Sequence, residues 1–159
     1  MVLRNLLSVF CVAFLLASPT HVSAAEQELS PATPQEFVKL YAAASAAMSA
    51  EAVAGFYNPD VTSIPFTGPS RVMRGNAQQQ KELGGLFEDL KSRGIVSLTL
   101  ADYAITQISD HFAFVRLRWE LSKSDGAISN VINSTYVLRR EDVGWRVATI
   151  LEMGKPHGP

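Results

Sequence analysis

The chain has 159 residues, of which 18% are charged, and a formal net charge of −1 at pH 7. It contains no block of Lys and Arg that could follow a phosphate backbone, so nucleic acid is not a favoured partner. The length suits one domain with an ordinary apolar core.

Residues 1–24 have the layout of a secretory signal peptide. Arg4 precedes an apolar run over residues 6–17, and small residues follow at positions 22–25. The run is shorter than the about 20 residues that span a bilayer, so we expect no stable membrane insertion after cleavage. Cleavage after Ala24 or Ala25 removes Cys11, the only cysteine, and leaves an exported chain without disulfides. The predicted location is the periplasm, with secretion beyond the cell left open.

Residues 25–34 are polar and include two prolines, which predicts a flexible segment with no role in the core. The spacing of Phe37, Tyr41 and Ala44 predicts an amphipathic helix over residues 35–48. A shorter helix is expected over residues 49–57, with Ser49 as its N-cap and with Asn58-Pro59-Asp60 ending it.

The next segment predicts two short strands and a third helix. Residues 61–66 read as an edge strand and residues 71–74 as a second, very short one. Apolar residues at helical spacing predict a helix over residues 76–93, which Gly94 closes in a left-handed conformation.

Residues 97–153 predict four long strands joined by short turns, which form a meander. In the second of them Val115, Leu117 and Trp119 face one side while Arg116 and Arg118 face the other. One apolar and one charged face are expected when helices cover a single side of an antiparallel sheet. The predicted domain covers residues 35–154, followed by a tail over residues 155–159.

This order of elements resembles the superfamily of nuclear transport factor 2, ketosteroid isomerase, scytalone dehydratase and the SnoaL-like polyketide cyclases. Three patterns carry the resemblance: LYAAASAAMSAEAVAGFYNPDVT, Arg74-Gly75 before the third helix, and the ending TYVLRREDVGWRVATI. The resemblance implies an α+β, cone-shaped fold, with three N-terminal helices on one face of a strongly curved antiparallel sheet. It also implies a conical pocket between the sheet and the first and third helices.

Alternation along the strands indicates which residues line that pocket. On the last strand Trp145, Thr149 and Leu151 share a side with one another. The predicted ligand-binding residues are Tyr41, Tyr57, Leu117, Trp119, Ser134, Tyr136, Thr149 and Leu151. Such a mostly apolar lining with a few hydroxyls suits a small, largely apolar molecule.

Ketosteroid isomerases need a tyrosine on the first helix, a carboxylate base after the second helix, and a protonated acid on a late strand. The resemblance aligns Tyr41 with the tyrosine, but it places Ile64 or Pro65 at the base position and no carboxylate at 134–136. We therefore do not expect isomerase chemistry of this type. For other proton-transfer chemistry, the candidates are Tyr41 as donor and Asp60 or Asp102 as base.

Neither a metal nor a cofactor is predicted. No two histidines share a strand face or a helical spacing, and no glycine-rich phosphate loop occurs. Asp110-His111 falls at a turn between two strands, where a solvated pair is the simpler interpretation.

Binding without catalysis is the favoured function: an exported domain that holds a small apolar molecule. The alternatives are a SnoaL-like enzyme of proton transfer, dehydration or cyclisation, and a domain used for protein contacts. Phe112 and Phe114 face the outer side of the sheet, where proteins of this superfamily often dimerise. We therefore expect a homodimer through that outer face.

Overall fold

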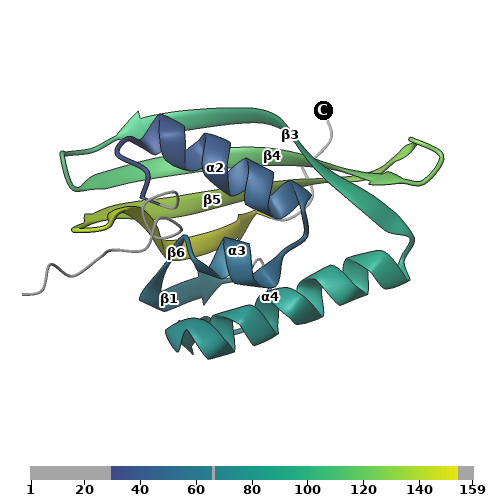
Figure 1. Ribbon diagram of the computed structural model, residues 1–159, viewed down its shortest axis with the longest axis horizontal. Helices are drawn as coiled ribbons and strands as arrows, with labels where there is room; N and C mark the ends of the chain where they lie inside the picture. Colours follow the sequence, from purple (N-terminus) through teal and green to yellow (C-terminus); the bar gives the residue numbers. More distant parts are fainter. Residues whose placement is uncertain (1–29, 66, 154–159) are drawn as a thin grey trace, which may run out of the picture.

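The computed structural model describes residues 30–65 and 67–153. The predicted signal peptide and tail, and residues 25–29, lie outside the described residues. The elements follow one another in the predicted order (Figure 1). They are α2 (Pro34–Ala46), α3 (Ala50–Ala54), β1 (Tyr57–Ile64), β2 (Arg71–Arg74), α4 (Gly75–Ser92), β3 (Ile95–Gln107), β4 (Phe112–Lys123), β5 (Ile128–Glu141) and β6 (Gly144–Met153).

Two side chains, Thr33 and Glu36, cap the start of the first helix. The Thr33 hydroxyl accepts a hydrogen bond from the Glu36 backbone N–H at 3.1 Å, and the Glu36 carboxylate accepts from the Ala32 N–H at 2.8 Å. Pro34 occupies the first turn, where its missing N–H costs nothing. These contacts fix where α2 starts relative to the segment before it.

Residues 30–33 form a segment, here the N-terminal strap, that lies against the start of β6. The Trp145 N–H donates to the Pro31 carbonyl at 3.0 Å, and the Trp145 indole N–H donates to the Ala32 carbonyl at 3.2 Å. Pro31 is buried. The sequence assigns this segment no role in the core, but its described part is bound to the sheet, because β6 offers donors that no local pattern reveals.

The second helix is shorter than predicted, and its start is as predicted. The Ser49 hydroxyl caps it by accepting from the Ala52 N–H at 3.2 Å. It ends at Ala54, because Phe56 and Tyr57 already pair with β6: the Val147 N–H donates to the Phe56 carbonyl at 2.8 Å. The predicted helix end at residue 57 is therefore wrong by three residues.

A bulge interrupts β1 at Asn58-Pro59-Asp60, where the sequence predicts the end of the second helix. Tyr57 pairs with Val147 and Thr62 with Thr149, so four residues of β1 face a single residue of β6. The buried side chain of Gln79 on α4 holds this bulge by donating to the Asn58 carbonyl at 2.6 Å and to the Pro59 carbonyl at 3.1 Å.

The six strands form one sheet in the order β2-β1-β6-β5-β4-β3. The four long strands are the predicted meander, each antiparallel to the next. β1, however, runs parallel to β6, so the sheet is not antiparallel throughout. A parallel neighbour needs a long connection, and here β2, α4 and three strands separate the two in sequence.

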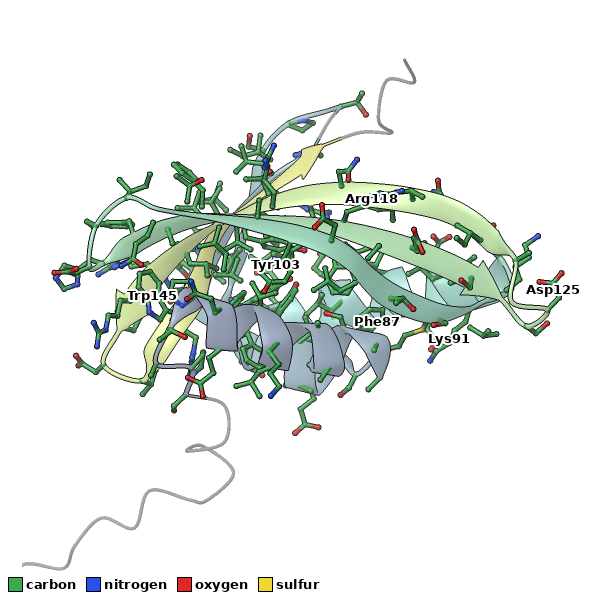
Figure 2. All side chains as sticks on the ribbon, turned by 90° about the horizontal axis from the view of Figure 1, so that it is seen from above. Phe87, Lys91, Tyr103, Arg118, Asp125 and Trp145 are labelled. Carbon is green, nitrogen blue, oxygen red and sulfur yellow. The ribbon has the colours of Figure 1, made fainter. Side chains whose placement is uncertain are left out.

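The alternation predicted for β4 is confirmed. Val115, Leu117 and Trp119 are buried, whereas Arg116 and Arg118 are exposed. Figure 2 shows Arg118 on the side of the sheet away from α2, and Phe87 of α4 on the same side as α2. The buried faces of the strands and helices form one apolar core.

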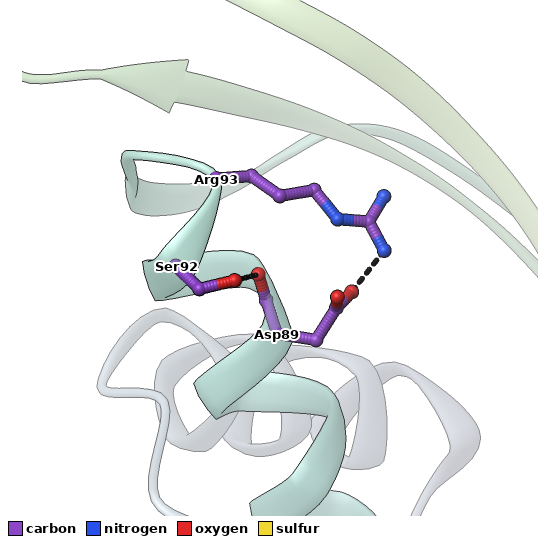
Figure 3. A network of polar contacts seen from close by, with 3 residues as sticks. All are labelled: Asp89, Ser92 and Arg93. Atoms are coloured by element: carbon purple, nitrogen blue, oxygen red, sulfur yellow. Dashed lines mark hydrogen bonds and ion pairs between the residues drawn. The ribbon is translucent and has the colours of Figure 1, made fainter.

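The third helix ends as predicted, in a left-handed Gly94 with φ of 79°. Its last turn is held by polar contacts (Figure 3): Arg93 forms an ion pair with Asp89, and the Ser92 hydroxyl donates to the Asp89 carbonyl at 2.7 Å. The Asp89 carbonyl also accepts from the Arg93 backbone N–H at 3.2 Å, so these side-chain contacts add to the last backbone hydrogen bonds of the helix. No helix among the described residues is both long and apolar enough to cross a membrane.

Candidate functional site

A cavity of about 400 Å³ lies between the sheet and the helices, within the size range of small-molecule sites. Every helix and strand contributes to it. Its apolar lining comprises Val53, Met73, Leu83, Leu86, Phe87, Leu90, Leu98, Trp119, Leu121, Val131, Ile132 and Ile150. Its polar lining comprises Tyr41, Ser45, Tyr57, Ser63, Arg71, Glu82, Asn130, Asn133, Ser134 and Tyr136.

Four of the polar residues form a group that we call the hydroxyl cluster: Tyr41, Tyr57, Ser134 and Tyr136. The Tyr41 hydroxyl lies 3.4 Å from that of Tyr57 and donates to that of Tyr136, also at 3.4 Å. The Ser134 hydroxyl donates to the Tyr136 oxygen at 3.3 Å. Hydroxyl pairs prefer about 2.7–2.8 Å, so these hydrogen bonds are long.

Aromatic rings hold Tyr41 in the centre of this cluster. Its ring stacks on Phe37 with centroids 5.2 Å apart and meets Tyr136 edge to face at 5.4 Å. Trp119 lies beside it at 6.4 Å. Burial raises the pKa of the Tyr41 hydroxyl well above its usual value, and the neighbouring tyrosines raise it further. Tyr41 is therefore a neutral hydrogen-bond donor at physiological pH.

The rim of the cavity, its edge toward solvent, carries charged side chains. Arg71 of β2 and Glu82 of α4 form an ion pair across it, with the guanidinium Nη1 3.3 Å from the carboxylate Oε2. Two apolar lining residues are also open to solvent: Leu86 is 49% exposed and Ile132 is 36% exposed. Sequence reasoning singled out neither Arg71 nor Glu82, although Glu82 shares helical spacing with the predicted apolar stripe of α4.

Five of the eight predicted ligand-binding residues meet at the cavity: Tyr41, Tyr57, Trp119, Ser134 and Tyr136. Leu117 is buried in the core and does not line it. Ligand contact by these residues stays a prediction.

Thr149 and Leu151, also predicted as lining, do not reach the cavity. Val137 pairs with Thr149 and the next residue, Leu138, with Val147, so Ala148 is an extra residue on β6. This bulge reverses the facing of the rest of the strand. Ile150, buried and paired with Tyr136, lines the cavity in their place.

The predicted acids lie elsewhere. Asp60 in the β1 bulge and Asp102 on β3 are exposed and do not line the cavity. Asp110 and His111 are exposed in the turn between β3 and β4. Across the described part of the chain, no three His, Cys, Asp or Glu side chains gather as metal ligands would.

Three helices, a curved six-stranded sheet and a cavity between them define an NTF2-like protein. A family model described as "NTF2-like protein (DUF6841)" matches residues 13–154, and the chain belongs to this family. The predicted resemblance to the superfamily is thus confirmed.

Solved structures with the same fold include bacterial proteins of low sequence identity. An NTF2-like protein with a cystatin-like fold from Novosphingobium aromaticivorans is 17% identical over 77% of this chain and 79% of its own, with a TM-score of 0.60. A domain of unknown function with a cystatin-like fold from Nostoc punctiforme is 18% identical over 75% and 73%, at 0.56.

A ketosteroid isomerase-like protein from Erwinia carotovora atroseptica is 21% identical over 72% of this chain and 87% of its own, with a TM-score of 0.50. No curated protein sequence matches the chain. At these identities the likeness establishes the fold, and one fold hosts unrelated chemistries.

Proposed function

We propose that this chain is an exported, non-catalytic domain that binds a small, largely apolar molecule in the cavity. The observation that carries the proposal is the lining itself, in which twelve apolar side chains surround a small group of buried hydroxyls. Pockets that hold small molecules combine apolar walls with a few placed polar groups in this way. Export to the periplasm rests on the signal-peptide pattern of residues 1–24.

The test is binding of N-phenyl-1-naphthylamine, a neutral dye that fluoresces in apolar surroundings. Saturable binding at one site per chain is expected. Leu86→Trp narrows the rim and should weaken binding about tenfold, equivalent to roughly 1.4 kcal/mol. Val96→Trp is the matched control, because Val96 is also exposed but does not line the cavity. Equal binding by both variants would place the dye elsewhere and count against the proposal.

Catalysis by a SnoaL-like enzyme is the alternative, and the position of the acids does not favour it. A base must reach the proton that it removes, directly or through one water. Asp60 and Asp102 are exposed and outside the lining. Glu82 does line the cavity, but it is paired with Arg71 at the rim.

We also propose that two copies pair through the outer face of the sheet. Phe112 and Phe114 are 44% and 43% exposed there. Phe114 is paired with Val137, which is itself paired with Thr149, so three neighbouring strands contribute to one partly apolar surface. A surface of this kind is typical of an interface between proteins.

A further inference from the structure

A mostly buried arginine, Arg146, lies on the outer face of the sheet. It belongs to β6 and is paired with Arg139 of β5, which is itself paired with the exposed Phe112 of β4. Residues paired across antiparallel strands share a face, so these three side chains form one row on the outer side. Arg146 is only 7% exposed, although it points away from the apolar core.

The Arg146 guanidinium has N–H groups that bind nothing in the protein. Its Nη1 donates to the Trp145 carbonyl at 3.0 Å, which is its one hydrogen bond within the described part of the chain. Among the described residues, Asn58 Oδ1 is the one fully buried side-chain N or O atom without a partner. Nε and Nη2 of Arg146 therefore reach solvent. The residue buries its hydrocarbon stem and presents these donors at the surface.

The positive charge of Arg146 is not paired either. On the same face, Arg139 forms an ion pair with Glu141 at 3.2 Å. Arg146 takes part in none of the ion pairs that the described residues form. Its burial lowers the pKa of the guanidinium, and the nearby Glu141 carboxylate offsets only part of this shift. An arginine stays protonated in proteins, so an unpaired charge remains at this point of the sheet.

These features match a carboxylate as the ligand. A planar guanidinium donates two parallel hydrogen bonds to the two oxygens of one carboxylate. The row has two guanidiniums and the Glu141 carboxylate, so one positive charge is left to balance. One carboxylate balances it, whereas a doubly charged oxyanion would add a surplus negative charge beside Glu141. The Arg146 stem is already packed, so little side-chain entropy is lost on binding.

We propose that the outer face of the sheet carries a second binding site, in which Arg146 and Arg139 hold the carboxylate group of a small molecule. Arg146 donates the hydrogen bonds from its outward N–H groups, and Arg139, opposite it on β5, adds positive charge. Neither arginine lines the cavity. The inference therefore goes beyond the proposed function and does not depend on it.

The experiment titrates ¹⁵N-labelled protein at pH 7 and constant ionic strength. The probes are acetate, its neutral analogue acetamide, and the doubly charged sulfate, and the readout is the backbone N–H signals of residues 139 and 146. Acetate should shift these signals to saturation, and acetamide should leave them unchanged. Arg146→Gln should weaken acetate binding about tenfold or more, the effect of losing a charge-assisted hydrogen bond.

Three further variants complete the design. Arg116→Gln is the matched control, because Arg116 is exposed on the same face and joins no ion pair among the described residues. It should bind acetate as the wild type does. Arg146→Lys keeps the charge without the planar fork and should bind with intermediate affinity. The Phe112→Ser, Phe114→Ser double variant is titrated as well, so that two copies paired through this face cannot hide the site.

Contrary results have distinct meanings. Equal affinity of Arg146→Gln and the wild type for acetate overturns the site, and so does an equal loss in Arg116→Gln. Tighter binding of sulfate than of acetate overturns the carboxylate class. If acetate shifts neither residue 139 nor residue 146 in the wild type and in the double variant, the site does not exist. The cavity proposal would be untouched by that failure, because the dye tests it separately.

Discussion

Gly144 and Pro31 approach so closely that a Cβ atom on Gly144 would lie 2.5 Å from the Pro31 carbonyl oxygen. Gly144 also has a positive φ of 95°, which other residues adopt at a cost. Gly144→Ala should therefore lower the free energy of unfolding by about 3 kcal/mol, through backbone strain and a displaced strap. Gly126→Ala, with φ of 80° and nothing within 4 Å of the added Cβ, should cost only the strain, about 1–2 kcal/mol. Equal losses in urea unfolding would contradict a packed strap.

The side chain of Gln79 joins two segments, α4 and the β1 bulge. Gln79→Ala leaves the carbonyls of Asn58 and Pro59 without this donor and should cost about 2–4 kcal/mol. At pH 7, Gln79→Glu should lower the free energy of unfolding more than Gln79→Ala does, because a carboxylate cannot donate a hydrogen bond to the two carbonyls. Gln80→Ala, on the next residue of the helix, should stay within about 0.5 kcal/mol of wild type. Urea unfolding measures all three, and a small effect at Gln79 would argue against this bridge.

The extra residue at Ala148 can be tested by a pair of truncations on β6. Ile150→Ala removes a buried side chain and should lower the free energy of unfolding by about 2–4 kcal/mol. Leu151 is half-buried on the opposite side, so Leu151→Ala should cost about 1 kcal/mol. Without the bulge the order would reverse. Chemical denaturation of the two variants therefore decides which face each residue occupies.

Tyr41 should make stability depend on pH in the alkaline range. Burial raises its folded pKa well above the ordinary tyrosine value of about 10, so the folded state holds the proton more tightly than the unfolded chain does. The corresponding stability is fully present below about pH 10 and falls as the pH rises toward the folded pKa, by about 1.4 kcal/mol per pH unit. Unfolding free energies between pH 9 and pH 11 should decline less steeply in Tyr41→Phe. Identical slopes would contradict this expectation.

The proposed dimer can be tested on the outer sheet face. The double substitution of Phe112 and Phe114 to Ser should convert a dimer to a monomer in sedimentation velocity, while melting stays close to wild type because both side chains are exposed. Val143→Ser, at another exposed apolar site in the β5–β6 turn, serves as control. A wild type that is already monomeric, or a variant that stays dimeric, would exclude this interface.

Much of the fold could be predicted because its signals are local. Turn residues at 109–110, 123–126 and 141–144 separate strands whose side chains alternate, and each strand pairs with the next. Five cavity residues, Tyr41 and Trp119 among them, follow from the same alternation and from helical spacing. These inferences need no knowledge of how distant segments meet.

The errors arise where distant segments meet. Strict alternation carried through Ala148 predicts Thr149 and Leu151 in the cavity, but β6 has a bulge at Ala148, where the strand lies between β1 and β5. Helix α3 ends earlier than predicted because the Phe56 carbonyl accepts a hydrogen bond from Val147, 91 residues later in the chain. The ion pair of Arg71 and Glu82 joins β2 and α4, and the sequence pattern of each element alone indicates only an exposed charged residue at these positions. Such contacts depend on tertiary packing, which no single stretch encodes.

The strap and the rim lie at opposite ends of β6. The strap bonds to Trp145 near the start of the strand, and the cavity-lining Asn133 is paired with residue 153 at its other end. Eight residues of strand separate them, about 27 Å at the usual rise. Any segment joined ahead of residue 30 is therefore attached at the end of β6 remote from the rim of the cavity. A purification tag or a surface tether placed there would be attached at the end of β6 away from the cavity-lining Asn133.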